Sequence, residues 1–257
     1  MDFQEVLRRR RMVRAFEPRP IPPDLLRRVL GVLPRTPTAG NTEGLAVLVL
    51  EGPEQTRTYW SLTTTEDWRS RSRRWPGLAA APVIVLVLTS ADRYLERYAE
   101  PDKVASGLGR VPSATSEEVS GRWPVPYWFV DAGQAIYGLL LGAVDAGLGA
   151  CLLGTFRGEE ALRRALGVPP AWRVAGAVLL GWPAGTDPRS PSLDRPWRRQ
   201  ARLDPGQLVH WGRWHGPPLD PSAEPTLPAP GTPQASKVGT SPGQVASKEP
   251  GNGPAGG

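Results

Sequence analysis

The chain has 257 residues, with ten tryptophans, 30 prolines and 29 glycines but only one cysteine and two histidines. The single Cys151 excludes a disulfide framework, and the sequence holds no Cys/His cluster that could form a structural zinc site. His210 and His215 leave little material for a Ser-His-Asp hydrolase. If the protein is an enzyme, a bound cofactor is therefore expected to carry the chemistry.

The net charge of +6 comes almost entirely from arginine, because only three of the 31 basic residues are lysines. Arginine pairs are scattered along the chain among 25 acidic residues, whereas nucleic-acid-binding proteins concentrate their charge in one patch or stripe. Only residues 8–11 form a dense basic run. The charge pattern therefore predicts no nucleic-acid partner. Two explanations of the many arginines remain open: a phosphorylated ligand, or a genome whose codon usage favours arginine.

The sequence shows neither a secretory signal nor a membrane-spanning segment. The N-terminus begins with an acidic residue and lacks the apolar region of a signal peptide. The most apolar stretch, 129–153, contains Asp131, Gln134 and Asp145, and its unbroken apolar part is too short to cross a bilayer. We expect a soluble, cytoplasmic protein with no membrane partner.

The predicted elements alternate helices with a few strands. Short helices are expected at 3–7 and 22–33, the second because Pro23 and Asp24 suit a first helical turn. Apolar runs and helical spacing predict strands at 46–50, 82–88, 150–153 and 174–180, helices at 56–75, 92–99 and 159–166, irregular segments at 36–44 and 103–124, and a closing segment at 207–214. This order predicts an α+β sandwich with a mixed sheet.

Residues 128–147 form the strongest predicted helix, and it is apolar nearly all round, so we expect it to be central and buried. Its small and polar residues share an arc of roughly 90° when each residue turns about 100°; they are Asp131, Gln134, Gly138, Gly142 and Asp145. Such a stripe permits close approach of a neighbouring helix. This helix is too apolar for one chain to cover easily, so it also predicts a homodimer, in which Gly138 and Gly142 would permit close packing.

A composition break falls near Gly216. Residues 216–257 contain 18 prolines and glycines and no aromatic residue. Such a segment cannot bury enough apolar surface to offset the entropy lost on ordering. We therefore expect one folded domain at 1–215 and a disordered tail at 216–257.

The glycine-rich stretch at 147–154 superficially resembles a dinucleotide-binding fingerprint. That motif requires a strand before its glycines and a helix after them, whereas here a predicted helix precedes and a strand follows. The Rossmann interpretation is therefore excluded.

The run of arginines at 8–11, followed by Arg14, allows two interpretations. A solvated charge run is the usual one. Arginine's planar fork also suits bidentate phosphate recognition, and an extended backbone after the helix would place Arg14 beside Arg10.

Three segments, in this order, resemble the FMN-dependent nitroreductase superfamily. The first is the pattern R-R-x-V-R-x-F at 10–16, followed by a leucine-rich helix and by TPTAGNTE at 36–43. The second, DAGLGACLLGTF at 145–156, is similar to the segment that borders the flavin in that family. The third, LVHWGRW at 208–214, resembles the usual end of its members.

The resemblance implies an α+β fold in which a mixed, mainly antiparallel sheet lies between helices and two subunits interlock as a homodimer, with 1–215 as the FMN-binding domain. It further implies which residues contact FMN. The phosphate would be held by Arg10, Arg11, Arg14 and Arg202, with Met12 among them; the flavin would be approached from the partner subunit by Thr38, Ala39, Gly40 and Asn41; and its edge would face the backbone of Leu152, Leu153, Gly154 and Thr155, near the reactive nitrogen.

The sequence departs from the family pattern at several positions. Met12 replaces a frequent serine and so lacks a hydroxyl for the phosphate. Glu43 stands where glutamine is usual, and a carboxylate cannot donate a hydrogen bond. Gly44 and Leu45 replace a proline–aromatic pair, and the segment that holds Arg73 and Arg74 is only loosely similar.

Other chemically notable residues have a structural interpretation that competes with a functional one. Trp60, Trp68, Trp75 and Trp128 could line a substrate cleft or simply pack in the interior. Cys151 lies in an apolar run, which favours an inert thiol. His210 is expected to be structural rather than a catalytic base. The resemblance itself assigns no catalytic side chain and no metal, because the chemistry belongs to the flavin.

The function implied is that of an FMN-dependent oxidoreductase. It would move hydride from NADH or NADPH to an electron-poor small-molecule acceptor, such as a nitroaromatic or a quinone, by a ping-pong mechanism. Two alternatives remain open: another flavin-dependent activity of the superfamily, such as a dehydrogenase or dehalogenase, and a flavin-binding protein that stores or senses flavin without turnover.

Overall fold

A computed structural model describes residues 1–107, 123, 125–186, 209–210, 212–214 and 216. The chain divides into two compact units, residues 1–190 and 191–257, and every element below belongs to the first. Arg202 and nearly all of the tail expected at 216–257 lie outside the described residues. The division of the chain into a domain at 1–215 and a tail therefore stays a prediction.

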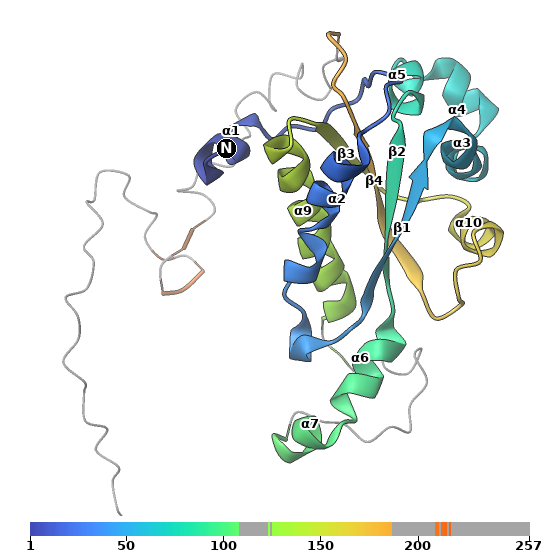
Figure 1. Ribbon diagram of the computed structural model, residues 1–257. Helices are drawn as coiled ribbons and strands as arrows, with labels where there is room; N and C mark the ends of the chain where they lie inside the picture. The colour runs from blue at the N-terminus through green and yellow to red at the C-terminus, as the bar shows by residue number, and fades with distance from the viewer. Residues whose placement is uncertain (108–122, 124, 187–208, 211, 215, 217–257) are drawn as a thin grey trace, which may run out of the picture. The chain divides into compact units, whose positions relative to one another are not determined.

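Four antiparallel strands form one sheet in the order β1-β2-β4-β3 (Figure 1). The strands are β1 (Leu45–Glu51), β2 (Val83–Thr89), β3 (Gly149–Leu153) and β4 (Arg173–Gly181). Every residue of β2 is buried, as expected for a central strand of aliphatic residues covered on both faces. All four predicted strands are confirmed to within one residue at each end.

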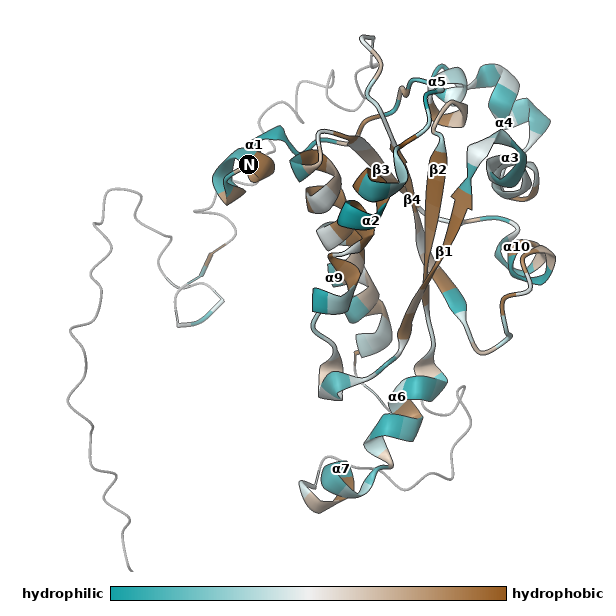
Figure 2. Ribbon diagram, in the orientation of Figure 1, coloured by the Kyte–Doolittle hydropathy of each residue, from teal (hydrophilic) through white to brown (hydrophobic). Residues whose placement is uncertain are grey.

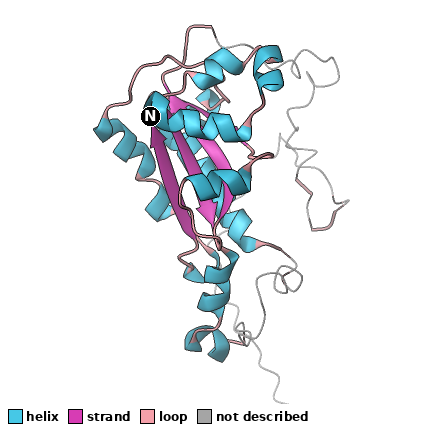
Figure 3. Cartoon of the chain, turned by 90° about the vertical axis from the view of Figure 1, so that its right-hand side faces the viewer, coloured by secondary structure: helices cyan, strands magenta, loops and turns pink. Residues whose placement is uncertain are grey.

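Helices cover both faces of this sheet (Figures 1 and 3). On one face lie α2 (Pro23–Leu30) and α9 (Tyr127–Asp145); on the other lie α3 (Gly52–Thr63), α5 (Trp75–Ala79) and α10 (Glu159–Ala165). Alternate residues of β2 enter the two resulting cores, Val83 and Val85 the first and Ile84 and Leu86 the second. Figure 2 shows the apolar strands with the more polar helices α2 and α10 on either side of them. The α+β sandwich is confirmed.

The remaining helices are α1 (Phe3–Arg9), α4 (Glu66–Arg71), α6 (Ala91–Tyr98) and α7 (Pro101–Ala105), with short 3-10 turns at Leu33–Arg35 and Ala39–Asn41. The single helix predicted at 56–75 is wrong, because α3 and α4 divide that stretch and α5 begins at its last residue. Thr64 is extended, and the hydroxyl of Thr65 accepts a hydrogen bond from the Trp68 N–H at 3.2 Å. Consecutive β-branched residues and a good N-cap therefore end one helix and start the next.

Only half of α9 is buried in the single chain. Ala132, Ala135 and Leu139 are fully buried against the sheet, whereas Val130 and Tyr137 are 45% and 47% exposed. The helix is central, as predicted, and one chain leaves part of its apolar surface uncovered. Among the described residues, no helix combines the length and apolarity needed to span a membrane.

The two glycines of the stripe on α9 do receive a neighbouring helix, but that helix is α2 of the same chain, with Val32 just beyond its end. A Cβ on Gly142 would lie 3.0 Å from Cγ1 of Val32 and 3.5 Å from the carbonyl oxygen of Val29. Gly138 also faces Val32. Substitution of Gly142 would therefore disturb internal packing, which corrects the association of this stripe with the dimer.

Candidate functional site

The arginine-rich segment at 10–14 runs beside strand β3. The Val13 N–H donates to the Ala150 carbonyl oxygen at 2.9 Å, and Met12 forms a parallel bridge with Ala150. This bridge is the parallel part of an otherwise antiparallel sheet. The Leu152 N–H donates to the Met12 Sδ at 3.5 Å. Two segments 140 residues apart, both predicted to contact the flavin, thus lie side by side.

Close packing fixes the backbone at Arg14. Its guanidinium donates to the Met12 carbonyl oxygen at 3.0 Å, and the side chain is half-buried. A Cβ on Gly77 of α5 would come within 2.7 Å of the Arg14 carbonyl oxygen and 2.8 Å of the Ala15 Cα. Only glycine allows α5 to lie this close, so α5 also brings Arg74, at its N-cap, toward this part of the chain.

The predicted flavin-edge segment leaves the sheet next to an aromatic pocket. Gly154 and Thr155 follow the last residue of β3. A pocket of about 480 Å³ lies beside them, and among its walls are Trp60, Trp68, Gly154, Phe156 and Arg157. Phe156 is 95% exposed. The arrangement offers aromatic surface next to a turn of backbone.

The tryptophans named from the sequence form two separate groups. Trp75 packs edge-on against Trp60 at 5.1 Å and against Trp68 at 5.8 Å between ring centroids, and this group borders the aromatic pocket. Trp128 is buried at the start of α9, 6.3 Å from the ring of Tyr94. The first group thus lines a pocket, and Trp128 belongs to the interior.

The segment at 38–41 is a tight turn beside helix α6 and the N-terminal part of α9. Gly40 and Asn41 have φ values of +69° and +55°, the left-handed region that favours glycine and asparagine. The Ala39 N–H donates to the Asp131 carboxylate at 2.7 Å, and the Gly40 carbonyl oxygen accepts from Arg97 at 2.9 Å.

Helix α9 separates this turn from the arginine-rich segment. Asp131 binds Ala39 near the N-terminal end of α9, whereas Asp145, at its last residue, binds Met1 and Arg28. Fourteen residues of helix at about 1.5 Å each put the two carboxylates about 20 Å apart. Within one chain, the segments at 38–41 and 10–14 therefore lie toward opposite ends of α9 (Figure 1).

The departures noted in the sequence have structural counterparts. Met12 bonds the Leu152 N–H through its sulfur, as described above. Gly44 is required because a Cβ there would overlap the ring of Tyr94. Glu43 is exposed and borders a polar pocket of about 400 Å³ together with Asn41 and residues of α6. Cys151 is buried, and His210 stacks on Trp214 at 4.8 Å in the second unit.

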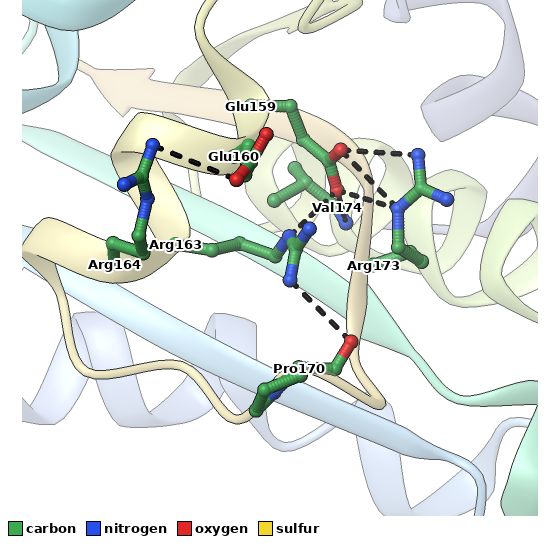
Figure 4. A network of polar contacts seen from close by, with 7 residues as sticks. All are labelled: Glu159, Glu160, Arg163, Arg164, Pro170, Arg173 and Val174. Carbon is green, nitrogen blue, oxygen red and sulfur yellow. Dashed lines mark hydrogen bonds and ion pairs between the residues drawn. The ribbon is translucent and has the colours of Figure 1, made fainter.

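An ionic network anchors the chain just beyond the predicted flavin-edge segment (Figure 4). Glu159 begins α10, and its carboxylate accepts from Arg163 at 3.1 Å, from Arg173 at 2.9 and 3.0 Å, and from the Val174 N–H at 3.1 Å. Burial raises the pKa of Glu159, but the hydrogen bonds and positive charges outweigh burial and hold this pKa below its ordinary value. The network ties α10 to the start of β4.

Replacing Glu159 with Gln is expected to lower the free energy of unfolding at pH 7 by about 1–3 kcal/mol, because charge-assisted hydrogen bonds are lost. The folded-state pKa lies below the ordinary 4.5, so this stabilisation is complete above pH 4.5 and disappears as the pH falls through the folded-state pKa. Urea unfolding of both proteins between pH 7 and pH 3 measures the difference. The control is Glu160→Gln, whose exposed pair with Arg164 at 3.5 Å should matter little. A loss that is independent of pH would contradict this account.

The fold resembles several solved structures. One is a nitroreductase family protein from Clostridium difficile 630, with 18% identity, a TM-score of 0.55 and coverage of 83% of this chain and 99% of that one. Another, from Clostridium novyi NT, has 21% identity, a TM-score of 0.53 and coverage of 72% and 87%. A third, from Streptococcus pneumoniae TIGR4, has 17% identity, a TM-score of 0.55 and coverage of 74% and 94%.

At these identities the structures show the likeness of the fold, and the sequence comparison goes further. The family model described as "Nitroreductase family" matches residues 7–182, well over half of the chain. The match includes the segments at 10–16, 36–43 and 145–156 and excludes Arg202. By this match the chain belongs to the nitroreductase family.

Proposed function

We propose that this protein is an FMN-dependent oxidoreductase that moves hydride from NADH or NADPH to an electron-poor acceptor, such as a nitroaromatic or a quinone, by a ping-pong mechanism. Membership of the nitroreductase family supports the coarser statement, a flavin-dependent oxidoreductase. One observation carries the finer proposal: the arginine-rich segment lies directly against the strand whose end is expected to border the flavin.

The donors at this place fit the chemistry of FMN. Guanidinium groups suit a phosphate dianion, and backbone N–H groups at a strand end suit the oxygen and nitrogen atoms of a flavin edge. The residues that would hold the cofactor are Arg10, Arg11, Met12, Arg14 and Arg202 toward the phosphate, Leu152, Leu153, Gly154 and Thr155 toward the ring edge, and Thr38, Ala39, Gly40 and Asn41 from the partner subunit. Met12 would take part through its backbone and by its bond to Leu152.

FMN, when bound, supplies the redox chemistry. The chain's own residues bind and orient. The arginines neutralise the phosphate, and the N–H groups of Gly154 and Thr155 stabilise negative charge at the ring edge. The aromatic pocket beside Gly154 offers flat apolar surface for an acceptor. Among the described residues, no three His, Cys, Asp or Glu side chains gather as metal ligands.

A homodimer is part of this proposal. The exposed side of α9 carries Val130, Gly133, Gln134 and Tyr137, which share one face at helical spacing. A second copy would cover this apolar face. It would also explain how the segment at 38–41, which lies toward the other end of α9 from the arginines, can contact a flavin.

Sedimentation at micromolar concentration should show a dimer, and a stable monomer would contradict this part of the proposal.

The absorbance spectrum of the purified protein, followed by steady-state assays, tests the function. We expect a flavin spectrum, released cofactor that is FMN, and oxidation of NADH or NADPH with a quinone acceptor. Bound flavin without turnover would favour storage or sensing, and turnover only with other acceptors would favour another activity of the superfamily. A protein that binds no added FMN would overturn the proposal.

A further inference from the structure

The turn at 38–41 is held by a buried carboxylate. Asp131 is 3% exposed, although it lies on an otherwise apolar helix, and Tyr94 beside it is fully buried. The Asp131 Oδ2 accepts from both the Ala39 N–H and the Tyr94 hydroxyl, each at 2.7 Å, and Oδ1 accepts from Gln134 at 3.2 Å. Burying a carboxylate is costly unless hydrogen bonds compensate for lost hydration. These neutral donors supply that compensation.

Asp131 holds the backbone of the turn rather than one of its side chains, because its bond to the turn comes from the Ala39 N–H. Burial and the neighbouring Asp131 raise the pKa of Tyr94, so its hydroxyl keeps its proton and remains a donor. One carboxylate oxygen thus joins α6, α9 and the backbone of the turn at a single point. Ala39 can move away only if Oδ2 loses a charge-assisted hydrogen bond.

Arg97 holds the same turn from the side of α6. Its Nε donates to the Gly40 carbonyl oxygen at 2.9 Å, and its terminal nitrogens bind Asp102 at 2.7 and 2.8 Å and Glu100 at 2.8 Å. These contacts lower the pKa of Asp102 to about 2, so the pair stays charged at neutral pH. The Tyr98 ring lies below Gly40, where a Cβ would come within 2.8 Å of it. The turn is therefore held at two peptide units, the one before Ala39 and the one after Gly40.

We propose that Asp131 is a positioning residue, which together with Arg97 fixes the turn at 38–41 so that its backbone can meet the flavin of the partner subunit. The proposal rests on the function proposed above. Asp131 does not touch the cofactor; it acts through the Ala39 N–H. Neither the arginine pattern nor the glycine-rich segment points to it.

Two replacements of Asp131 separate its bonding from its volume. Asn keeps an oxygen that can accept from both Ala39 and Tyr94, whereas Leu has a similar size and no acceptor. Asp145→Leu is the matched control, because Asp145 is a carboxylate four turns further along the same helix with partners elsewhere. Hydrogen exchange of the full-length protein, measured with and without added FMN, reports on amides 39–41.

Without FMN, Asp131→Leu should speed exchange of the Ala39 amide about ten- to a hundredfold, as expected for loss of a bond to a charged group. The exchange rate of the Ala39 amide in Asp131→Asn should stay within about threefold of the wild-type rate, because the amide oxygen still accepts the bond. A threefold change corresponds to about 0.7 kcal/mol. With FMN titrated, Asp131→Leu should raise the FMN dissociation constant about tenfold or more. Asp145→Leu should change neither value.

Unchanged exchange rates of amides 39–41 in Asp131→Leu would overturn the positioning role, whatever the FMN affinity of the variant. Faster exchange with unchanged FMN affinity would overturn the link between the turn and the flavin. If wild type itself binds no FMN, the proposed function fails, and the exchange data still decide whether Asp131 holds the turn. Should Asp131→Leu not fold, Arg97→Lys removes the guanidinium that bonds Gly40, Glu100 and Asp102, and it must speed exchange at residue 41 or its neighbours for the proposal to stand.

Discussion

Replacing Arg14 with Ala is expected to weaken FMN binding by about ten- to a hundredfold. A charge-assisted hydrogen bond contributes about 1.5–3 kcal/mol, and about 1.4 kcal/mol is a factor of ten in affinity. Arg14 is half-buried beside β3, and Met12 has no hydroxyl to share in binding the phosphate. Fluorescence titration of the flavin-free protein measures the effect. Riboflavin, which has no phosphate, should bind wild type and variant almost equally.

Arg9→Ala provides the matched control for Arg14→Ala. Arg9 belongs to the same basic run, but it lies in the last turn of α1, is 63% exposed and pairs with Glu5. Its removal changes the net charge by the same amount and should leave FMN affinity nearly unchanged. Equal FMN dissociation constants for wild type and Arg14→Ala would show that Arg14 does not bind the phosphate and would favour the interpretation of the basic run as a solvated surface.

Replacing Gly158 with Ala is expected to cost about 2–5 kcal/mol of unfolding free energy, by the sum of left-handed backbone strain and overpacking. Gly158 is the N-cap of α10 with φ +65°, and a Cβ there would overlap the carbonyl oxygen of Leu62 in α3. Because the obstacle is backbone, α3 or α10 must move. Thermal unfolding should show a fall in the melting temperature of roughly 4–20 °C for a domain of this size.

Gly167→Ala separates the two sources of this cost. Gly167 follows the other end of the same helix with φ +66°, and nothing lies within 4 Å of a Cβ placed there. Its replacement introduces the same backbone strain without the overlap, so it should cost about 1–2 kcal/mol. The difference between the two variants measures the close approach of α3 and α10. Equal losses would show that the overlap is relieved by a small shift.

The sheet could be predicted from the sequence because its signals are local. Uninterrupted aliphatic runs such as the one from Val83 mark strands covered on both faces, wherever the rest of the chain goes. The break between α3 and α4 is also local, since it depends on Thr64 and Thr65. It was missed because the residues on both sides of it follow a helical pattern. The identity of the exposed face of α9 could not be predicted, because apolarity alone does not say which face the chain itself covers.

The candidate site divides in the same way. Neighbouring arginines and glycines are visible as patterns, and the structure brings the segments at 10–14 and 150–152 together. The hold on the turn at 38–41 depends on contacts over 92 residues to Asp131 and 57 residues to Arg97. No spacing rule connects residues so far apart. The available signal was Asp131, a carboxylate on an apolar helix. It marked a position of interest but did not indicate which residues Asp131 contacts.

The length of α9 has a genetic consequence in the proposed dimer. Each site would take its arginines from one chain and its turn at 38–41 from the other, since one chain presents these parts toward opposite ends of the helix. A chain damaged at Arg14 and a chain damaged at Asp131 would each fail when paired with itself. Paired together, they would complement one another: one site would inherit both defects, and the other would be assembled from two undamaged halves.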